Sequence, residues 1–125
     1  MRVRGFRWVG VETDRVTEMR QFAIDVLGLR IRDHDSEDFV ELVTGDGSRL
    51  ELFGPGAGAP EQFSANPVVA GFLVDDIHAA RRELEATPDV TLLGDVGSIP
   101  SGYCWQHFRA PDGRVYELVM DPLAD

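Results

Sequence analysis

Two glutamates stand in the middle of apolar segments, where a charged group is costly. Glu51 lies in SRLELF (48–53) and Glu117 lies in RVYELVM (114–120). A carboxylate in such a segment must be paired or solvated. We therefore interpret both as pocket carboxylates that bind a hydrogen-bond donor or act as a general base, with Glu117 as the catalytic candidate. The structural alternative is an ion pair, because Arg49 shares the strand face of Glu51.

The first half of the chain predicts four strands and one helix. Val16, Met19 and Ala23 recur at helical spacing. Asp14 is the expected N-cap of this helix and Gly28 its C-terminal glycine. The other expected elements are strands at 7–13, 29–33, 38–43 and 49–53, a polar turn HDSED (34–38) and a hairpin turn TGDGS (44–48).

The second half repeats this order after a linker at 55–65. WVGVETDRVTEMR (8–20) aligns with VAGFLVDDIHAAR (69–81), and TGDGSRLEL (44–52) aligns with APDGRVYEL (110–118). The expected elements are strands at 66–74, 90–95, 103–108 and 114–120, and a helix at 77–86 that Asp75 caps and Pro88 stops. We divide the single domain of 1–125 into a module of about 1–54 and a module of about 66–125.

Strand alternation assigns the side chains of each hairpin to a face. With APDG as the turn, Gln106 and Phe108 are expected on the face of Glu117, and His107 on the opposite face. In the first hairpin, the equivalent face is expected to carry Val40, Leu42, Arg49, Glu51 and Phe53. Both glutamates would then line the sheet surface that points away from the helices.

The composition is that of an acidic globular protein. The chain has 22 acidic against 12 basic residues and a net charge of −10, which argues against nucleic acid as a partner. No apolar run approaches the ~18 residues of a membrane span, and the N-terminus lacks a signal-peptide core. Cys104 is a single cysteine and forms no intramolecular disulfide. We therefore expect a cytoplasmic protein without a membrane partner.

The chain resembles the vicinal oxygen chelate superfamily, which groups glyoxalases, bleomycin-resistance proteins and extradiol dioxygenases. The resemblance rests on FAIDVLGL (22–29), LELF (50–53), FLVDDIHAARREL (72–84) and FRAPDGRVYEL (108–118). It implies an α+β fold in which two tandem βαβββ modules form a curled mixed sheet around a central pocket. The helices would lie on the outer face, and the chain would form a homodimer.

The resemblance also assigns positions for a divalent metal, with one ligand from the first and one from the last strand of each module. The last-strand positions match Glu51 and Glu117, and the first-strand positions fall on Trp8 and Val69. Neither Trp8 nor Val69 can bind a metal, and two carboxylates are a poor site for zinc, nickel or ferrous iron. We expect no cofactor; a weakly held divalent metal, such as magnesium or manganese, is the alternative.

Two functions from different classes stay open. The first is a small-molecule-binding protein, similar to glyoxalases and bleomycin-resistance proteins, with a degenerate metal site and a cationic or aromatic organic ligand. The second is a lyase, isomerase or dioxygenase of the same superfamily that uses Glu51 and Glu117 with a weakly held metal or as a general base. The expected substrate-binding residues are Trp8, Arg49, Glu51, Phe53, Gln106, Phe108 and Glu117.

Overall fold

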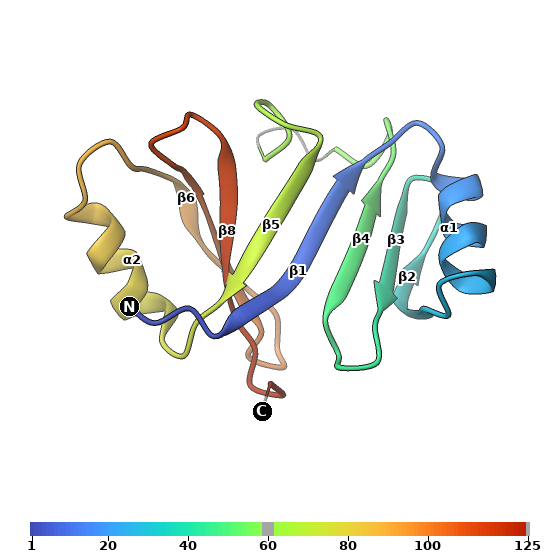
Figure 1. Cartoon of the computed structure of the whole chain (residues 1–125), viewed down its shortest axis with the longest axis horizontal. Coiled ribbons are helices and arrows are strands. Elements are labelled where there is room, and N and C mark those ends of the chain that lie inside the picture. The colour runs from blue at the N-terminus through green and yellow to red at the C-terminus, as the bar shows by residue number, and fades with distance from the viewer. Residues whose placement is uncertain (59–61, 125) are drawn as a thin grey trace.

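In the described part of the chain, residues 1–58 and 62–124 of a computed structural model, one curled eight-stranded sheet carries a helix near each end (Figure 1). Residues 59–61, inside the expected linker, and residue 125 lie outside the described residues. The first half consists of β1 (Gly5–Glu12), α1 (Val16–Asp25), β2 (Arg30–Asp35), β3 (Phe39–Val43) and β4 (Arg49–Phe53). The second half consists of β5 (Val68–Leu73), α2 (Ile77–Glu85), β6 (Thr91–Ser98), β7 (Cys104–Arg109) and β8 (Val115–Met120).

The strand order β2-β3-β4-β1-β5-β8-β7-β6 shows that the two halves have the same topology. In each half the first strand is parallel to the last, β1 to β4 and β5 to β8, and the other pairs are antiparallel. The antiparallel pair β1 and β5 joins the halves at the centre (Figure 1). The α+β fold of two βαβββ units with a mixed, curled sheet is therefore confirmed.

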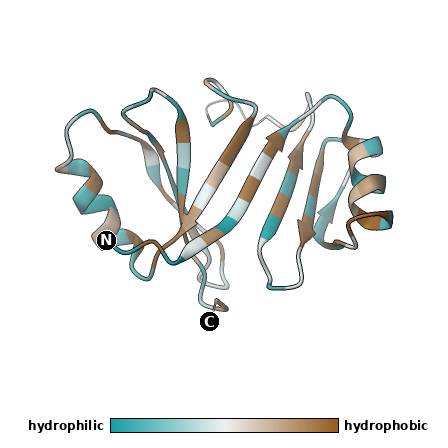
Figure 2. Ribbon diagram, in the orientation of Figure 1, coloured by the Kyte–Doolittle hydropathy of each residue, from teal (hydrophilic) through white to brown (hydrophobic). Residues whose placement is uncertain are grey.

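The two helices cover the outer face of the sheet at its ends, and each closes a hydrophobic core. Apolar and polar residues alternate along the strands, so that one face of each strand can pack against a helix (Figure 2). Val16 and Ala23 of α1 pack over β3 and β4, and Ile77 and Leu84 of α2 pack over β7 and β8. No helix in the described residues is long and apolar enough to cross a membrane.

The predicted N-caps of both helices are displaced by one residue. Asp76, rather than Asp75, caps α2, and its carboxylate accepts from the backbone N–H of His78 and Ala79. The residue before α1 is Arg15, whose side chain makes no capping hydrogen bond. In both cases an acidic or hydroxylated run precedes the helix, so that several residues could serve as the cap.

The predicted register of both hairpins is wrong by one residue, because their loops have three residues. The backbone N–H of Ala110 donates to Arg114 O and that of Thr44 donates to Ser48 O, both at 2.9 Å. Gly113 and Gly47 take the left-handed conformation that such loops require, with φ of 80° and 85°. The loops therefore place His107 opposite Glu117 and Glu41 opposite Glu51.

We predict that Gly113→Ala lowers the free energy of unfolding by about 1–2 kcal/mol, because an L side chain is strained at positive φ. Gly45→Ala is the matched control, since Gly45 has open space around a new Cβ and no positive φ. Urea denaturation of the two variants measures the difference. Equal stabilities would contradict the role of the loop conformation.

Candidate functional site

A cavity of about 300 Å³ lies on the face of the sheet opposite the helices and is lined by both halves of one chain. Its aromatic wall includes Trp8, Phe39, Phe53, Tyr103 and Trp105. Its ionisable lining includes Glu41, Arg49, Glu51, His107 and Glu117. The cavity therefore combines apolar surface with several ionisable groups that are shielded from water.

Trp8 lies at the centre of this surface and binds Glu51. The register of β1 shifts between Phe6 and Trp8, so that Arg7 is an extra residue in the strand. The indole Nε1 of Trp8 donates to Glu51 Oε1 at 2.8 Å. A Cβ on Gly10, the β1 residue opposite Glu51, would lie only 2.1 Å from the Trp8 ring. The indole can therefore lie along β1 only because residue 10 is glycine.

Glu117 is almost fully buried and faces His107 across the β7–β8 pair. His107 Nε2 lies 2.7 Å from Glu117 Oε2. The pair does not meet the geometry of a hydrogen bond, and we describe it as a close contact. The second glutamate predicted from the sequence is thus paired with a histidine from the neighbouring strand.

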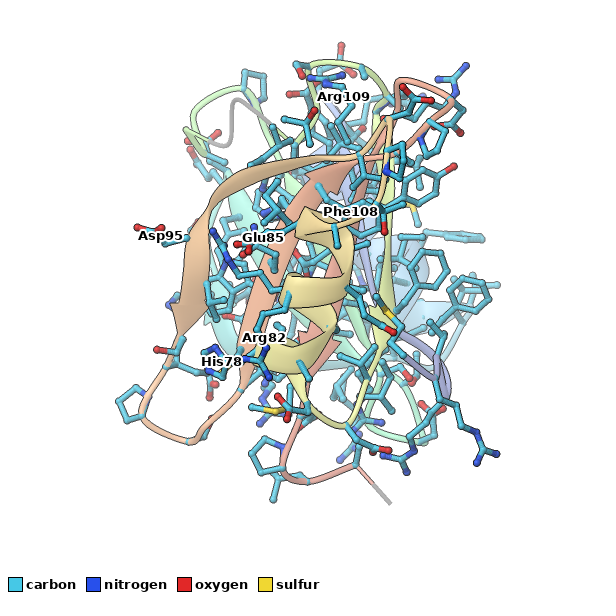
Figure 3. All side chains as sticks on the ribbon, turned by 90° about the vertical axis from the view of Figure 1, so that its left-hand side faces the viewer. His78, Arg82, Glu85, Asp95, Phe108 and Arg109 are labelled. Atoms are coloured by element: carbon cyan, nitrogen blue, oxygen red, sulfur yellow. The ribbon has the colours of Figure 1, made fainter. Side chains whose placement is uncertain are left out.

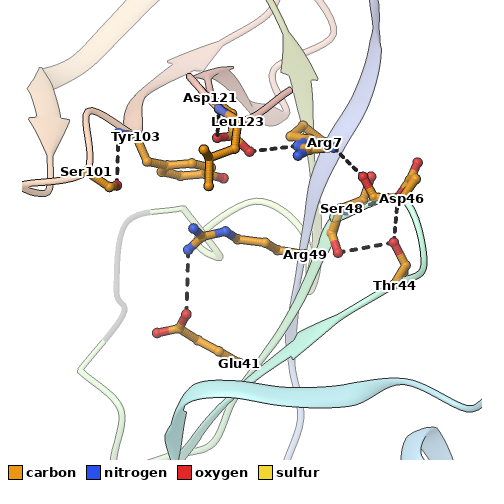
Figure 4. A network of polar contacts seen from close by, with 10 residues as sticks. All are labelled: Arg7, Glu41, Thr44, Asp46, Ser48, Arg49, Ser101, Tyr103, Asp121 and Leu123. Carbon is orange, nitrogen blue, oxygen red and sulfur yellow. Dashed lines mark hydrogen bonds and ion pairs between the residues drawn. The ribbon is translucent and has the colours of Figure 1, made fainter. Parts of the chain in front are cut away.

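A third carboxylate, Glu41, lies on β3 beside Glu51. Its Oε1 contacts His34 Nδ1, and its Oε2 lies 3.5 Å from Arg49 Nη1. The guanidinium of Arg49 also stacks on Tyr103, with 4.0 Å from its central carbon to the ring centroid. Figure 4 shows Arg49 between the Tyr103 ring and Glu41. This arrangement holds a buried cation between an aromatic face and a carboxylate.

Arg7 connects the two halves of the chain. Its Nε donates to Asp121 Oδ2 at 2.8 Å, and its Nη1 donates to Asp46 O at 2.9 Å (Figure 4). Asp46 lies in the β3–β4 loop and Asp121 directly follows β8. Arg7, the extra residue of β1, therefore holds the β3–β4 loop of the first half close to the segment that follows β8 in the second half.

Burial changes the protonation of the pocket. The pKa of Glu51 is raised to about 7, mainly by burial and also by the nearby charges of Glu41 and Glu117. The hydrogen bond from Trp8 stabilises the carboxylate and partly opposes this rise. Burial also raises the pKa of Glu117, and His107 beside it opposes this shift. Burial and the nearby Glu117 raise the pKa of Tyr103, so that its hydroxyl stays protonated and can donate. Near neutral pH the pocket thus holds a carboxyl group that can exist in either protonation state.

The structure places five of the predicted site residues on the pocket and two elsewhere. Trp8, Arg49, Glu51, Phe53 and Glu117 line the cavity. Gln106 and Phe108 point to the opposite face, because the three-residue loop shifts the register. Phe108 packs in the core beneath α2, and Figure 3 shows it beside that helix. Gln106 is buried and donates to the backbone oxygens of Leu93, Gly94 and His107.

The same one-residue shift brings residues to the pocket that the sequence analysis missed. The strand pattern predicts His107 on the opposite face, and Glu41 is not among the predicted site residues. His34 was expected in a turn but lies in β2, within reach of Glu41. A loop of three residues that ends in glycine, in both TGDGS and APDGR, is the sequence signal that could have revealed the correct register.

Two of the four positions that the resemblance assigns to a metal carry no donor for a metal ion. The Trp8 indole N–H is a hydrogen-bond donor and already binds Glu51, and Val69 is apolar and fully buried. Among residues 1–58 and 62–124, no group of three or more His, Cys, Asp or Glu side chains is arranged to hold a metal ion. The residues present therefore do not fit the metal site of the superfamily.

The structure is similar to several solved structures. A glyoxalase/bleomycin resistance protein/dioxygenase superfamily member from Vibrio splendidus 12B01 is 20% identical over 93% of this chain and 99% of that chain, with a TM-score of 0.65. Methylmalonyl-CoA epimerase from Mycobacterium tuberculosis is 16% identical over 95% and 89%, with a TM-score of 0.70. The Mn(II)-bound glyoxalase from Novosphingobium aromaticivorans is 23% identical over 96% and 40%, with a TM-score of 0.73.

These similarities confirm the vicinal oxygen chelate fold that the sequence motifs implied. The identities are low, so the similarities establish the fold and leave the activity open. No family model matches the sequence, and no curated protein matches it either.

We predict that Glu51→Gln removes a pH-dependent loss of stability. The folded protein keeps a proton on Glu51 up to about pH 7, whereas the ordinary pKa is 4.5. The free energy of unfolding therefore falls as pH rises through this window, by about 3 kcal/mol for this group. Glutamine can still accept from Trp8, and the variant should be more stable than the wild type at pH 8 but not at pH 4.5.

Denaturation curves at pH 4.5, 6 and 8 measure this difference. Glu18→Gln is the control, because Glu18 is exposed on α1. Parallel pH profiles of wild type and Glu51→Gln would show that folding does not raise the pKa of Glu51.

Proposed function

We propose that this chain, which has the vicinal oxygen chelate fold, is a metal-independent binding protein for a small aromatic molecule. The observation that carries the proposal is the hydrogen bond from Trp8 to Glu51. The resemblance assigns metal ligands to positions 8 and 51. At position 8 stands an indole, and its N–H donates a hydrogen bond to the carboxylate at position 51. We interpret this arrangement as a degenerate metal site that has become part of a pocket wall.

The shape and lining of the cavity support a small organic ligand. Its volume of about 300 Å³ lies at the lower end of the range of small-molecule pockets. Trp8, Phe53 and Trp105 offer aromatic surface for stacking with a planar ligand. Buried polar and ionisable side chains also line the cavity, so that an aromatic ring with polar substituents would use both kinds of surface.

Intrinsic fluorescence tests the proposal, because both tryptophans of the chain line the cavity. We predict that a panel of one- and two-ring aromatic compounds includes members that change the tryptophan emission saturably in the presence of EDTA. Calorimetry then gives the stoichiometry and affinity. Glu117→Gln should alter the affinity, whereas the exposed Glu18→Gln on α1 should not.

Two results would count against this function. One is a panel in which no compound gives a saturable change. The other is binding that disappears in EDTA and returns with manganese or magnesium, which would restore the metal-dependent alternative.

The pKa of Glu51 favours a second candidate, an isomerase or lyase that moves a proton without a metal. A general base works best when its pKa lies near the working pH, and Glu51 has a pKa of about 7. In this reaction a C–H bond next to a carbonyl group breaks, the proton moves to a glutamate, and the electron pair moves to the carbonyl oxygen. Return of the proton to carbon completes an isomerisation.

We predict for this candidate that the protein speeds the exchange of the acidic C–H hydrogens of an aromatic 2-oxo acid, such as phenylpyruvate, with D₂O. Proton NMR follows the exchange against the rate without protein. Glu51→Gln and Glu117→Gln should reduce the rate to this background while circular dichroism shows a retained fold. Unchanged exchange in both variants would exclude the two glutamates as the base.

A further inference from the structure

Four buried polar atoms without a hydrogen-bond partner gather around the same cavity. They are Glu41 Oε2, Arg49 Nε, Tyr103 Oη and His107 Nε2. Within residues 1–58 and 62–124 these are all the buried side-chain nitrogen and oxygen atoms of this kind, and each belongs to a residue that lines the cavity. Buried polar groups are normally hydrogen-bonded, so this concentration indicates where a bound molecule would supply the missing partners.

Two of the four atoms have a charged neighbour, and two do not. Glu41 Oε2 lies 3.5 Å from Arg49 Nη1, and His107 Nε2 lies 2.7 Å from Glu117 Oε2. Arg49 Nε and the Tyr103 hydroxyl have no such neighbour, and the guanidinium stacks on the Tyr103 ring at 4.0 Å (Figure 4). Both groups are hydrogen-bond donors, and both belong to residues that are more than nine-tenths buried.

Each carboxylate of the pocket, in contrast, already has a hydrogen-bond donor or a basic side chain close to it. Glu51 accepts from Trp8, Glu117 contacts His107, and Glu41 contacts His34 and Arg49. The protein therefore neutralises its acidic groups from within, although its net charge is −10. In the described part of the chain, the pocket has no acceptor for Arg49 Nε and the Tyr103 hydroxyl. A ligand that supplies one differs in kind from the cationic ligand that the net charge of the protein favours.

We infer that the pocket selects molecules with a carboxylate or carbonyl oxygen, which accepts hydrogen bonds from Arg49 Nε and the Tyr103 hydroxyl. The inference rests on the proposed binding function and specifies its ligand class. The body of the molecule lies against Trp8 and Trp105. Arginine suits this role because its planar group can stack on an aromatic ring and still donate from its edge.

Three one-ring probes of similar size separate the ligand classes: benzoate, benzamide and benzylamine. Each is titrated in EDTA into wild type, Tyr103→Phe and Arg49→Lys, with tryptophan emission and calorimetry as readouts. Tyr103→Phe removes the hydroxyl and keeps the ring beneath Arg49. Arg49→Lys keeps the charge beside Glu41 and removes the Nε donor. Tyr116→Phe is the matched control, because its hydroxyl bonds to Asp112 outside the pocket.

Benzoate and benzamide should bind the wild type more tightly than benzylamine does. Tyr103→Phe should weaken both by roughly fivefold, as expected for one neutral hydrogen bond, and Arg49→Lys should weaken benzoate by roughly tenfold or more. Tyr116→Phe should leave all three affinities unchanged. If Arg49→Lys proves unstable in thermal unfolding, Tyr103→Phe carries the test alone.

Binding of benzylamine in preference to the other two would overturn the inference and leave the proposed binding function intact. So would affinities for benzoate and benzamide that do not change in Tyr103→Phe. If none of the three probes binds while other aromatic compounds do, the oxygen-acceptor class is likewise wrong. Failure of the whole aromatic panel would instead remove the binding function itself.

Discussion

The desolvation of three glutamates on one concave surface is the constraint on which the site depends. Charged carboxylates lose hydration when they are buried, and each must find a donor or a cation nearby or take up a proton. The sheet supplies a group for each from an adjacent strand: Trp8 for Glu51, His107 for Glu117, and Arg49 with His34 for Glu41. The ladder of paired strands therefore places the donors as well as the carboxylates.

The central tryptophan also limits which residues can stand beside it. Trp8 shares its face of the sheet with Gly10 on its own strand and with Gly71 on β5. A Cβ would lie 2.1 Å from the indole at Gly10 and 3.0 Å from the Trp8 Cβ at Gly71. The contact at Gly10 is too close for any side chain, so the indole fits there only because residue 10 is glycine. The contact at Gly71 is tight and involves the Cβ of Trp8 rather than its ring. These two glycines occupy equivalent positions in the two halves.

The order of the elements was predictable from the sequence, but the identity of the pocket face was not. Helical spacing, turn residues and the repeated segments are local signals, and they revealed two strand–helix–strand–strand–strand halves. The face of a strand depends on which residues pair across the loop, and a difference of one residue reverses it. For this reason the side chains of His107 and Glu41 lie in the pocket, whereas those of Gln106 and Phe108 lie on the helix side of the sheet. The bond between Trp8 and Glu51 joins distant segments, and no local pattern predicts it.

The two halves have equivalent strands but place unlike side chains at equivalent positions of the pocket. Glu51 and Glu117 correspond, yet Glu51 faces Glu41 across its hairpin and Glu117 faces His107. Trp8 in β1 corresponds to Val69 in β5, which lies buried against it. A floor with true two-fold symmetry would accept a molecule equally well in two opposite orientations. This floor presents different groups at its two ends, so that a molecule bound within it has one preferred orientation and would place each of its own ends against a different set of side chains.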